Sequence, residues 1–179
     1  MRRTAIDASP QGPIYLGYRL GHLKGDSRVF RSLVYNKGAM VLHMLRRLVG
    51  DEAFFSGLRE FYAKWRYKKA GTDDLRLAME NATGRSLDRF FDRWIYGSGI
   101  PTLRTTTTVS SSALRIRFDQ SENVYDVPVT VSLTYVDGTT EDVVVAVTEQ
   151  SVERSIPLKH ALRSFDLNRD GGALAEIVR

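Results

Sequence analysis

The feature that most constrains the fold is a change in the spacing of apolar residues at Pro101. Before it, apolar side chains recur every three or four residues, as on one face of a helix, and the clearest case is Leu87, Phe90, Phe91, Trp94 and Ile95. After it, β-branched runs such as 125–136 and 141–149 alternate apolar and polar residues in places. The sequence therefore predicts an α+β chain, with an all-helical half over residues 1–100 and a small antiparallel β-sandwich over residues 101–179.

Glycines and capping residues divide the first half into four predicted helices. The first is expected from Asn36 to Val49, because Gly50 is a favoured residue just past a helix end. Gly84 is expected to end the third helix in the same way. The N-caps of the second, third and fourth helices are predicted at Asp51, Thr72 and Ser86. Residues 9–27, rich in Gly and Pro, are read as an irregular lead.

About seven short strands are expected in the second half, with no helical pattern among them. The segment 136–140, Val-Asp-Gly-Thr-Thr, separates two of the longest runs. Asp-Gly tolerates the positive backbone angles of a tight turn, so these two runs are predicted to form a hairpin.

The composition limits the class of protein. Apolar residues make up 42% of the 179, enough for a packed core, and no run of them reaches the roughly 18 residues of a membrane span. No cysteine is present, so disulfides, thiolate metal sites and a cysteine nucleophile are excluded. The first residues, MRRTAIDASPQGP, contain no apolar core after the two arginines and do not resemble a signal peptide. The compartment is left open between cytoplasm and periplasm.

The charge is divided between the halves. Residues 1–100 hold 18 Lys/Arg against 10 Asp/Glu, a net of +8, whereas residues 101–179 hold 8 against 11, a net of −3. A basic half can bind nucleic acid, and the run Lys64–Lys69, KWRYKK, combines cations with aromatic rings. The favoured interpretation is a helix C-terminus, where cations complement the helix dipole. Nucleic acid is an unlikely partner, kept as an alternative.

No metal site is expected within this chain. The three histidines, His22, His43 and His160, lie far apart, and there is no His-Glu-x-x-His pair to present two imidazoles to zinc. His43 lies in an apolar segment and is read as a core or interface residue. Asp166, Asn168, Asp170 and Gly171 match the first positions of a calcium loop, but Glu176 comes one residue early, and a β-turn is the better interpretation.

The remaining candidate for chemistry is Tyr35. Neither a Gly-x-Ser-x-Gly elbow nor a glycine-rich phosphate loop is present. A phenol with a pKa near ~10 is a hydrogen-bond donor at neutral pH, and at a helix start beside an apolar wall it can stabilise an oxyanion. From spacing alone, packing is the commoner role of such a tyrosine.

A family resemblance gives Tyr35 more weight. Residues 34–103 contain, in order, a Tyr-x-Lys-Gly-Ala step opening a long segment, the junction LVGDEAF, the helix TDDL…ME…TG and the exit LDRFFDRWIYGSGIP. In this order they resemble the second half of the catalytic domain of M1-family zinc aminopeptidases, the gluzincins. The lead GPIYLGYRL is also similar to bacterial members, so the resemblance covers residues 11–103.

The resemblance implies a thermolysin-like catalytic half followed by a β-sandwich, and a zinc-dependent hydrolase that releases N-terminal residues from peptides. Tyr35 matches the family's catalytic tyrosine, which donates a hydrogen bond to the oxyanion opposite the zinc; the family usually has Glu where Asn36 follows it. The family's His-Glu-x-x-His segment, which supplies zinc ligands and general base, precedes this tyrosine and is not found among the 34 residues before it. The resemblance therefore implies a fragment that is inactive and free of zinc when alone.

Two further expectations follow. The segment Leu77–Asn81, LAMEN, is similar to the family's Gly-x-Met-Glu-Asn exopeptidase signature, but it lacks the glycine and follows the tyrosine. Glu80 is therefore expected to be an exposed helix residue with no role in substrate binding. A helical half built to pack on a missing N-terminal part is expected to expose apolar surface near Tyr35 and to form a homodimer. A non-catalytic M1-like module for protein contacts is the other alternative.

Overall fold

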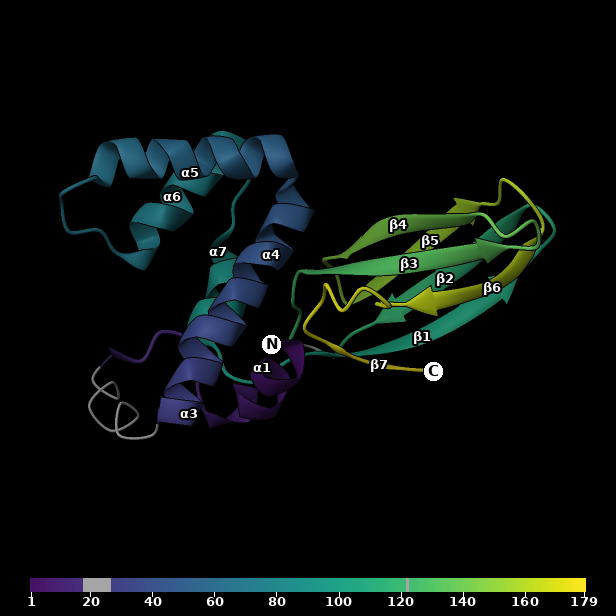
Figure 1. Ribbon diagram of the computed structural model, residues 1–179, viewed down its shortest axis with the longest axis horizontal. Coiled ribbons are helices and arrows are strands. Elements are labelled where there is room, and N and C mark those ends of the chain that lie inside the picture. Colours follow the sequence, from purple (N-terminus) through teal and green to yellow (C-terminus); the bar gives the residue numbers. More distant parts are fainter. Residues whose placement is uncertain (18–26, 122) are drawn as a thin grey trace.

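A computed structural model of the chain describes residues 1–17, 27–121 and 123–179 (Figure 1). Helices form one end of the molecule and two β-sheets form the other. The helical segments are α1 Arg2–Ala8, the 3-10 turn η1 Ser9–Gln11, α3 Ser27–Phe30, the π-helix η3 Arg31–Lys37, α4 Gly38–Val49, α5 Asp51–Trp65, α6 Thr72–Thr83, α7 Asp88–Phe91 and the π-helix η4 Asp92–Tyr96. The predicted α+β class is confirmed. The irregular lead predicted over residues 9–27 lies largely outside the described residues.

The first long helix begins earlier than predicted. Helical backbone is continuous from Ser27 through η3 into α4, and Gly50 ends it as expected. The prediction that it starts at Asn36 is wrong, because the residues before Asn36 already make helical turns, which include the wide turns of a π-helix. Helix α1 was not predicted; it packs against η3.

Glycines, not the predicted side chains, stand at two of the helix starts. Gly50 is the N-cap of α5 and Gly71 that of α6, so Asp51 and Thr72 lie one residue inside their helices. The Asp74 carboxylate accepts the Gly71 N–H at 2.8 Å. This bond satisfies a backbone donor that a helix start leaves without an intrahelical partner.

Helix α5 packs on α6 (Figure 1). A Cβ at Gly57 would lie 2.7 Å from the Met79 sulfur and 3.3 Å from the Ala78 carbonyl oxygen. Glycine at position 57 therefore permits the close approach of the two helices. Gly84 ends α6 in the left-handed conformation, as predicted.

The strands form two sheets. Their bounds are β1 Thr102–Val109, β2 Ala113–Asp119, β3 Val127–Tyr135, β4 Thr140–Val147, β5 Ser151–Pro157, β6 Leu162–Leu167 and β7 Glu176–Val178. One sheet has the order β5-β2-β1-β7 and the other β4-β3-β6. The predicted hairpin joins β3 to β4, with Gly138 at a φ of 86° in its turn. The strand pairs are antiparallel, as predicted, except for the short pair of β1 with β7, which is parallel.

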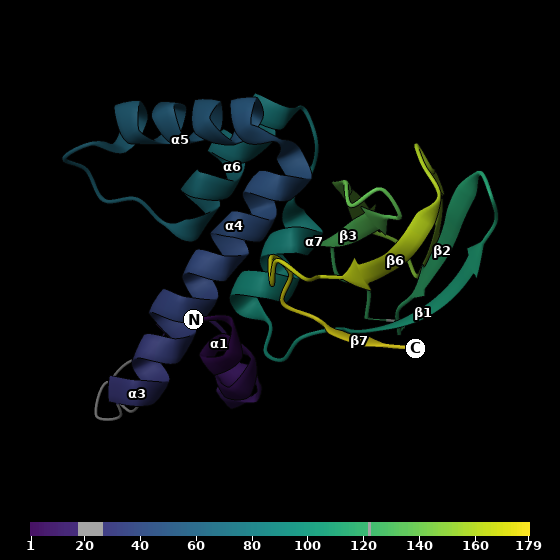
Figure 2. The ribbon, with the colours of Figure 1, turned by 45° about the vertical axis from the view of Figure 1, so that its right-hand side comes forward.

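The larger of the two apolar clusters in the described part of the chain runs through both ends of the molecule. Its buried members include Met44 and Trp94 from the helices and Val129 and Leu174 from the strand-bearing part. The fully buried Trp94 indole donates to the Asp126 carbonyl oxygen at 3.1 Å. The helices end at Tyr96 and β1 begins at Thr102, on either side of the predicted boundary (Figure 2). That residues 1–100 and 101–179 are separate domains remains a prediction.

A bilayer-spanning helix would need to be longer and more apolar than any helix in the described part of the chain.

Candidate functional site

Tyr35 lies inside the π-helix η3, not at a helix start, and its side chain is 64% exposed. Its ring stands edge-on to Phe30, with ring centroids 6.0 Å apart. A π-helix brings residues five apart onto the same side of the helix, and Phe30 and Tyr35 have this spacing. The Tyr35 hydroxyl makes no hydrogen bond to any described residue. The π-turn thus exposes the Tyr35 hydroxyl, which can donate a hydrogen bond to a group outside the described part of the chain.

The two residues that follow Tyr35 attach η3 to its surroundings. The Asn36 side-chain amide donates to Thr4 Oγ1 of α1 at 2.8 Å, and Thr4 in turn donates to the Met1 carbonyl oxygen. Lys37 is fully buried, and its Nζ donates to the Gly97 carbonyl oxygen at 3.4 Å, just past the end of η4. Desolvation by burial lowers the pKa of Lys37 from its ordinary value to about 8.

Lys37 was missed as a site residue by sequence reasoning, although a signal for it exists. Leu33, Lys37, Val41 and Leu45 follow one another at four-residue steps, and all four are buried. This spacing places Lys37 on the apolar face of the helix. A lysine on such a face is rare unless it has a specific partner.

His43 does not pack in the core, so the first of its two predicted roles is wrong, and a role at an interface remains a prediction. It is exposed on α4, next to the exposed Leu42. His160 lies in the β-sandwich, with Nδ1 3.6 Å from the Asp137 carboxylate. His22 lies outside the described residues.

The candidate calcium loop forms a turn in which the Gly171 N–H donates to the Asn168 carbonyl oxygen at 2.9 Å, the bond of a β-turn. Asn168 has a φ of 55°, and its side chain both accepts from and donates to the backbone of Ala173. The Asp170 carboxylate accepts from Thr130, Arg47 and the Gly172 N–H. The β-turn interpretation is confirmed.

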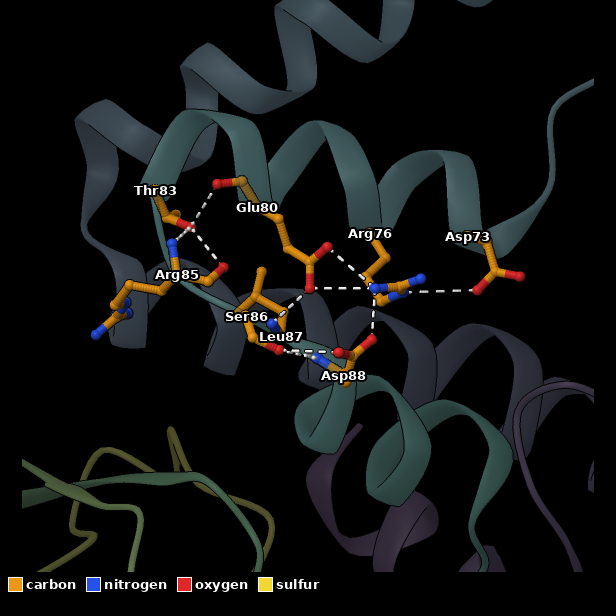
Figure 3. A network of polar contacts seen from close by, with 8 residues as sticks. All are labelled: Asp73, Arg76, Glu80, Thr83, Arg85, Ser86, Leu87 and Asp88. Atoms are coloured by element: carbon orange, nitrogen blue, oxygen red, sulfur yellow. Dashed lines mark hydrogen bonds and ion pairs between the residues drawn. The ribbon is translucent and has the colours of Figure 1, made fainter.

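Glu80 is not the exposed residue that was predicted (Figure 3). Its side chain is only 17% exposed and accepts the Leu87 N–H at 2.7 Å and Arg76 Nη1 at 3.0 Å. Arg76 also pairs with Asp88 at the start of α7. Glu80 therefore joins the end of α6 to the start of α7, because the chain turns back there and leaves a backbone donor to be satisfied.

The basic run Lys64–Lys69 only begins in a helix. Helix α5 ends at Trp65, and the following loop holds Tyr67 at a φ of 63° with 93% of its surface exposed. The Lys64 ammonium lies over the Trp65 ring, and the Arg66 guanidinium over the Tyr67 ring. The predicted position at a helix C-terminus is thus correct for Lys64, while the other cations lie in the loop.

A comparison with protein families decides which family this fold represents. The sequence model of the Peptidase family M1 domain matches residues 2–94, more than half of the 179 residues. The chain belongs to peptidase family M1. The predicted resemblance is confirmed, and the matched segment contains Tyr35 together with the residues around it.

M1 relatives among curated proteins are several times longer than this chain. Aminopeptidase N of Lactococcus lactis is 40% identical over 70 residues, covering 39% of this chain and 8% of its own length. The Tricorn protease-interacting factor F2 of Thermoplasma volcanium is 32% identical over 100 residues, covering 56% of this chain and 12% of its own. Probable aminopeptidase 1 of Saccharolobus solfataricus is 28% identical over 150 residues, covering 79% and 18%. The chain thus spans less than a fifth of the length of these M1 proteins.

A solved structure shares the fold of this chain beyond the segment that the family model matches. Legionella pneumophila aminopeptidase A, in complex with aspartic acid, superposes with a TM-score of 0.73 at 18% identity, covering 84% of this chain and 18% of its own. At this identity the likeness concerns the fold alone. The superposed 84% of the chain is larger than residues 1–100, so the likeness also covers part of the β-sandwich.

The M1 family implies zinc, and the side chains in the described part of the chain do not fit a zinc site. Nowhere in residues 1–17, 27–121 and 123–179 do three His, Cys, Asp or Glu side chains come together in a group that could hold a metal ion. A catalytic zinc needs about three protein ligands. We therefore derive no chemical step through a metal from these residues.

Proposed function

We propose that this chain is part of a zinc-dependent aminopeptidase and contributes Tyr35 as the donor that stabilises an oxyanion. The observation that carries the proposal is the exposed phenol of Tyr35 within the M1-matched segment, with no hydrogen-bond partner among the described residues. When water attacks a peptide carbonyl, negative charge develops on its oxygen, and a phenol O–H placed near that oxygen stabilises the charge. The substrate is a peptide with a free N-terminus.

The zinc ligands and the general base are proposed to lie outside these 179 residues. In support, the described part of the chain offers no metal-binding group, and the M1 relatives extend far beyond the matched segment. We further propose that the chain alone binds no zinc stoichiometrically and does not hydrolyse peptides.

Sequencing upstream of the codon for Met1 tests this proposal first. We expect an in-frame segment encoding His-Glu-x-x-His, and we expect its product to release amines from aminoacyl-p-nitroanilides with one zinc per chain. The 179-residue chain should do neither. If the 179-residue chain binds one zinc tightly and hydrolyses these substrates, the proposal is contradicted. A stop codon and a ribosome site before Met1 favour the non-catalytic M1-like module instead.

We also propose that a homodimer covers the face near Tyr35 when the chain is alone. Large apolar side chains are exposed on η3, on α4 and on the next helix α5, namely Tyr35, Leu42 and Phe55. Apolar side chains gathered on one face favour association, because burying them removes apolar area from water.

A further inference from the structure

We infer that Lys37 is a positioning residue for Tyr35: by binding the Gly97 carbonyl oxygen, it fixes the π-turn of η3 relative to the segment that joins the helices to the β-sandwich. This inference rests on the role proposed for Tyr35, two residues before Lys37. It assigns a function to a buried cation that the proposed chemistry does not use.

The joining segment is held at three successive residues by three different parts of the molecule. Gly97 accepts from Lys37 Nζ at 3.4 Å. The Ser98 carbonyl oxygen accepts from the Tyr125 hydroxyl, also at 3.4 Å. The Gly99 N–H donates to the Ser9 carbonyl oxygen at 2.9 Å. The N-terminal helices, the π-helix and the β-sandwich thus converge on one short piece of backbone.

The backbone at Gly97 is closely packed. A Cβ there would lie 2.5 Å from the Arg93 carbonyl oxygen, so only glycine fits. Gly99 adopts a φ of 82°, which side chains rarely tolerate. Both glycines are therefore required by the path of the chain, and the carbonyl that Lys37 binds occupies a fixed position.

Lys37 has no other strong partner. It forms no ion pair with any residue in the described part of the chain, and the lowering of its pKa has desolvation as its one cause. No carboxylate from α1, α4, η4 or the β-sandwich in the described part of the chain forms an ion pair with Lys37. A buried ammonium without a counter-ion is costly and depends on its hydrogen bonds. The bond from the Lys37 ammonium to the Gly97 carbonyl oxygen is charge-assisted, so it should weaken when Lys37 loses its proton.

The π-helix itself calls for such an anchor. Wide π-turns are rare in proteins, and they occur frequently at functional sites. The segment η3 ends at Lys37, and regular α-helix resumes at Gly38. An anchor at this boundary opposes a shift of the turn to α-helix, which would move Tyr35 around the helix axis and away from Phe30.

The test uses the 179-residue chain and requires no peptidase activity, so its failure is distinguishable from failure of the proposed function. We would place 4-fluorophenylalanine, which has no titratable phenol, at position 35 and follow its ¹⁹F resonance from pH 6.5 to 9.5. Hydrogen exchange of the Gly99 amide would be measured in parallel, corrected for intrinsic rates. Lys37→Met is the test variant, and Lys64→Met, at an exposed lysine, is the matched control.

With Lys37 intact, we expect the ¹⁹F resonance to move with a midpoint near pH 8, because desolvation lowers the pKa of Lys37 to about 8. Lys37→Met should abolish this transition, shift the resonance at neutral pH and speed Gly99 exchange by roughly two- to tenfold, the effect of losing one hydrogen bond. Lys64→Met should change none of these.

A ¹⁹F resonance at position 35 that neither titrates near pH 8 nor responds to Lys37→Met would overturn the inference. Uniformly faster exchange throughout the chain, without a specific change at position 35, would also overturn it, because it would mean that Lys37 contributes to stability alone. If Lys37→Met does not fold, the titration of the chain with Lys37 intact still decides.

Discussion

Arg47 of α4 and Asp170, in the turn after β6, form an ion pair in which Arg47 Nη1 lies 2.7 Å from Asp170 Oδ2. Thr130 of β3 donates to the same carboxylate oxygen at 2.6 Å and accepts from Arg47. The Gly172 N–H donates to the other carboxylate oxygen at 3.0 Å. This cluster joins helix α4 to strand β3 and to the turn after β6, which belong to the same sheet. The β-sandwich is thus attached to the helices by specific polar contacts as well as by the shared apolar core.

Asp170→Ala should lower the free energy of unfolding by about 2 kcal/mol at pH 7, because it leaves the largely buried Arg47 guanidinium without its anion. Urea unfolding measures the change. Asp142→Ala, at an exposed position on β4, is the control and should change the free energy by less than about 0.5 kcal/mol. Equal losses for the two variants would show that the cluster contributes nothing specific.

The ion pair between Arg47 and Asp170 also predicts that the free energy of unfolding depends on pH in the acidic range. Desolvation raises the pKa of Asp170, but hydrogen bonds from Thr130 and Gly172 and the Arg47 charge outweigh it and hold the pKa below its ordinary value. A carboxyl whose pKa is lowered on folding stabilises the protein above its unfolded pKa, and this contribution disappears as the pH falls through the folded value. The stability difference between the unmodified chain and Asp170→Ala should therefore shrink below pH ~4.

Lys37→Met should stabilise the chain at neutral pH. The pKa of Lys37 falls from 10.5 to about 8 on folding. Burial of the ammonium thus costs up to about 3 kcal/mol below pH 8, and this cost disappears as the pH rises from 8 towards 10.5. The free energy of unfolding of the unmodified chain should accordingly rise between pH 8 and 10.5. The amount by which Lys37→Met is more stable than the unmodified chain should decrease over the same range. Urea titrations at pH 7, 8, 9 and 10 measure both; a constant difference between the two proteins would contradict the prediction.

Glu80→Ala should lower the free energy of unfolding by about 2 kcal/mol, because the buried Leu87 N–H loses its acceptor and Arg76 loses one of its anions. Glu60→Ala, at an exposed glutamate of α5, is the matched control. In the complete parent, neither variant should change the KM for peptides, since Glu80 serves the α6–α7 junction. A rise in KM caused by Glu80→Ala alone would instead indicate contact with substrate.

The sequence predicts most of the elements because their signals are local. The apolar period of residues 87–95, the glycine stops at Gly50 and Gly84 and the Asp-Gly turn each act within a few residues. The π-helix around Tyr35 has no such local signal, and the hydrogen bonds of its last residues go to Thr4 of α1 and to Gly97, which are far away in the sequence. The parallel pairing of β1 with β7 likewise joins residues about 74 positions apart, as Thr102 and Glu176 show.

The functional site could be predicted only in part. Tyr35 comes from a motif, and its exposure agrees with a role in binding. The exposure of Glu80 was predicted wrongly, and so was a core position for His43, because burial depends on which neighbouring elements cover a helix face. The spacing of apolar residues in one helix does not predict that the Glu80 carboxylate accepts the Leu87 N–H across a turn. Nor does it predict that His43 is exposed to solvent.

Leu42→Glu should shift the chain from dimer to monomer. Leu42 is exposed on α4, which continues from η3, and in the proposed dimer a carboxylate there would have to be desolvated on association. Sedimentation velocity over a range of protein concentrations measures the change, with Leu77→Glu, at an exposed leucine on α6, as the control. A strictly monomeric profile of the unmodified chain at high concentration would remove the proposal of a homodimer.

Tyr35→Phe separates the role in chemistry from any role in folding. The Tyr35 hydroxyl bonds to no described residue and the Phe30 contact needs only the ring, so unfolding of the 179-residue chain should change by less than about 0.5 kcal/mol. In the complete parent, the same variant should lower kcat by roughly 10²–10³, the usual effect of removing one oxyanion donor. KM should change little, because the hydrogen bond strengthens only as charge develops on the carbonyl oxygen. An unchanged kcat in a parent that is active and zinc-loaded would refute the role proposed for Tyr35, whereas a loss of stability in the short chain would show that the hydroxyl has a structural partner.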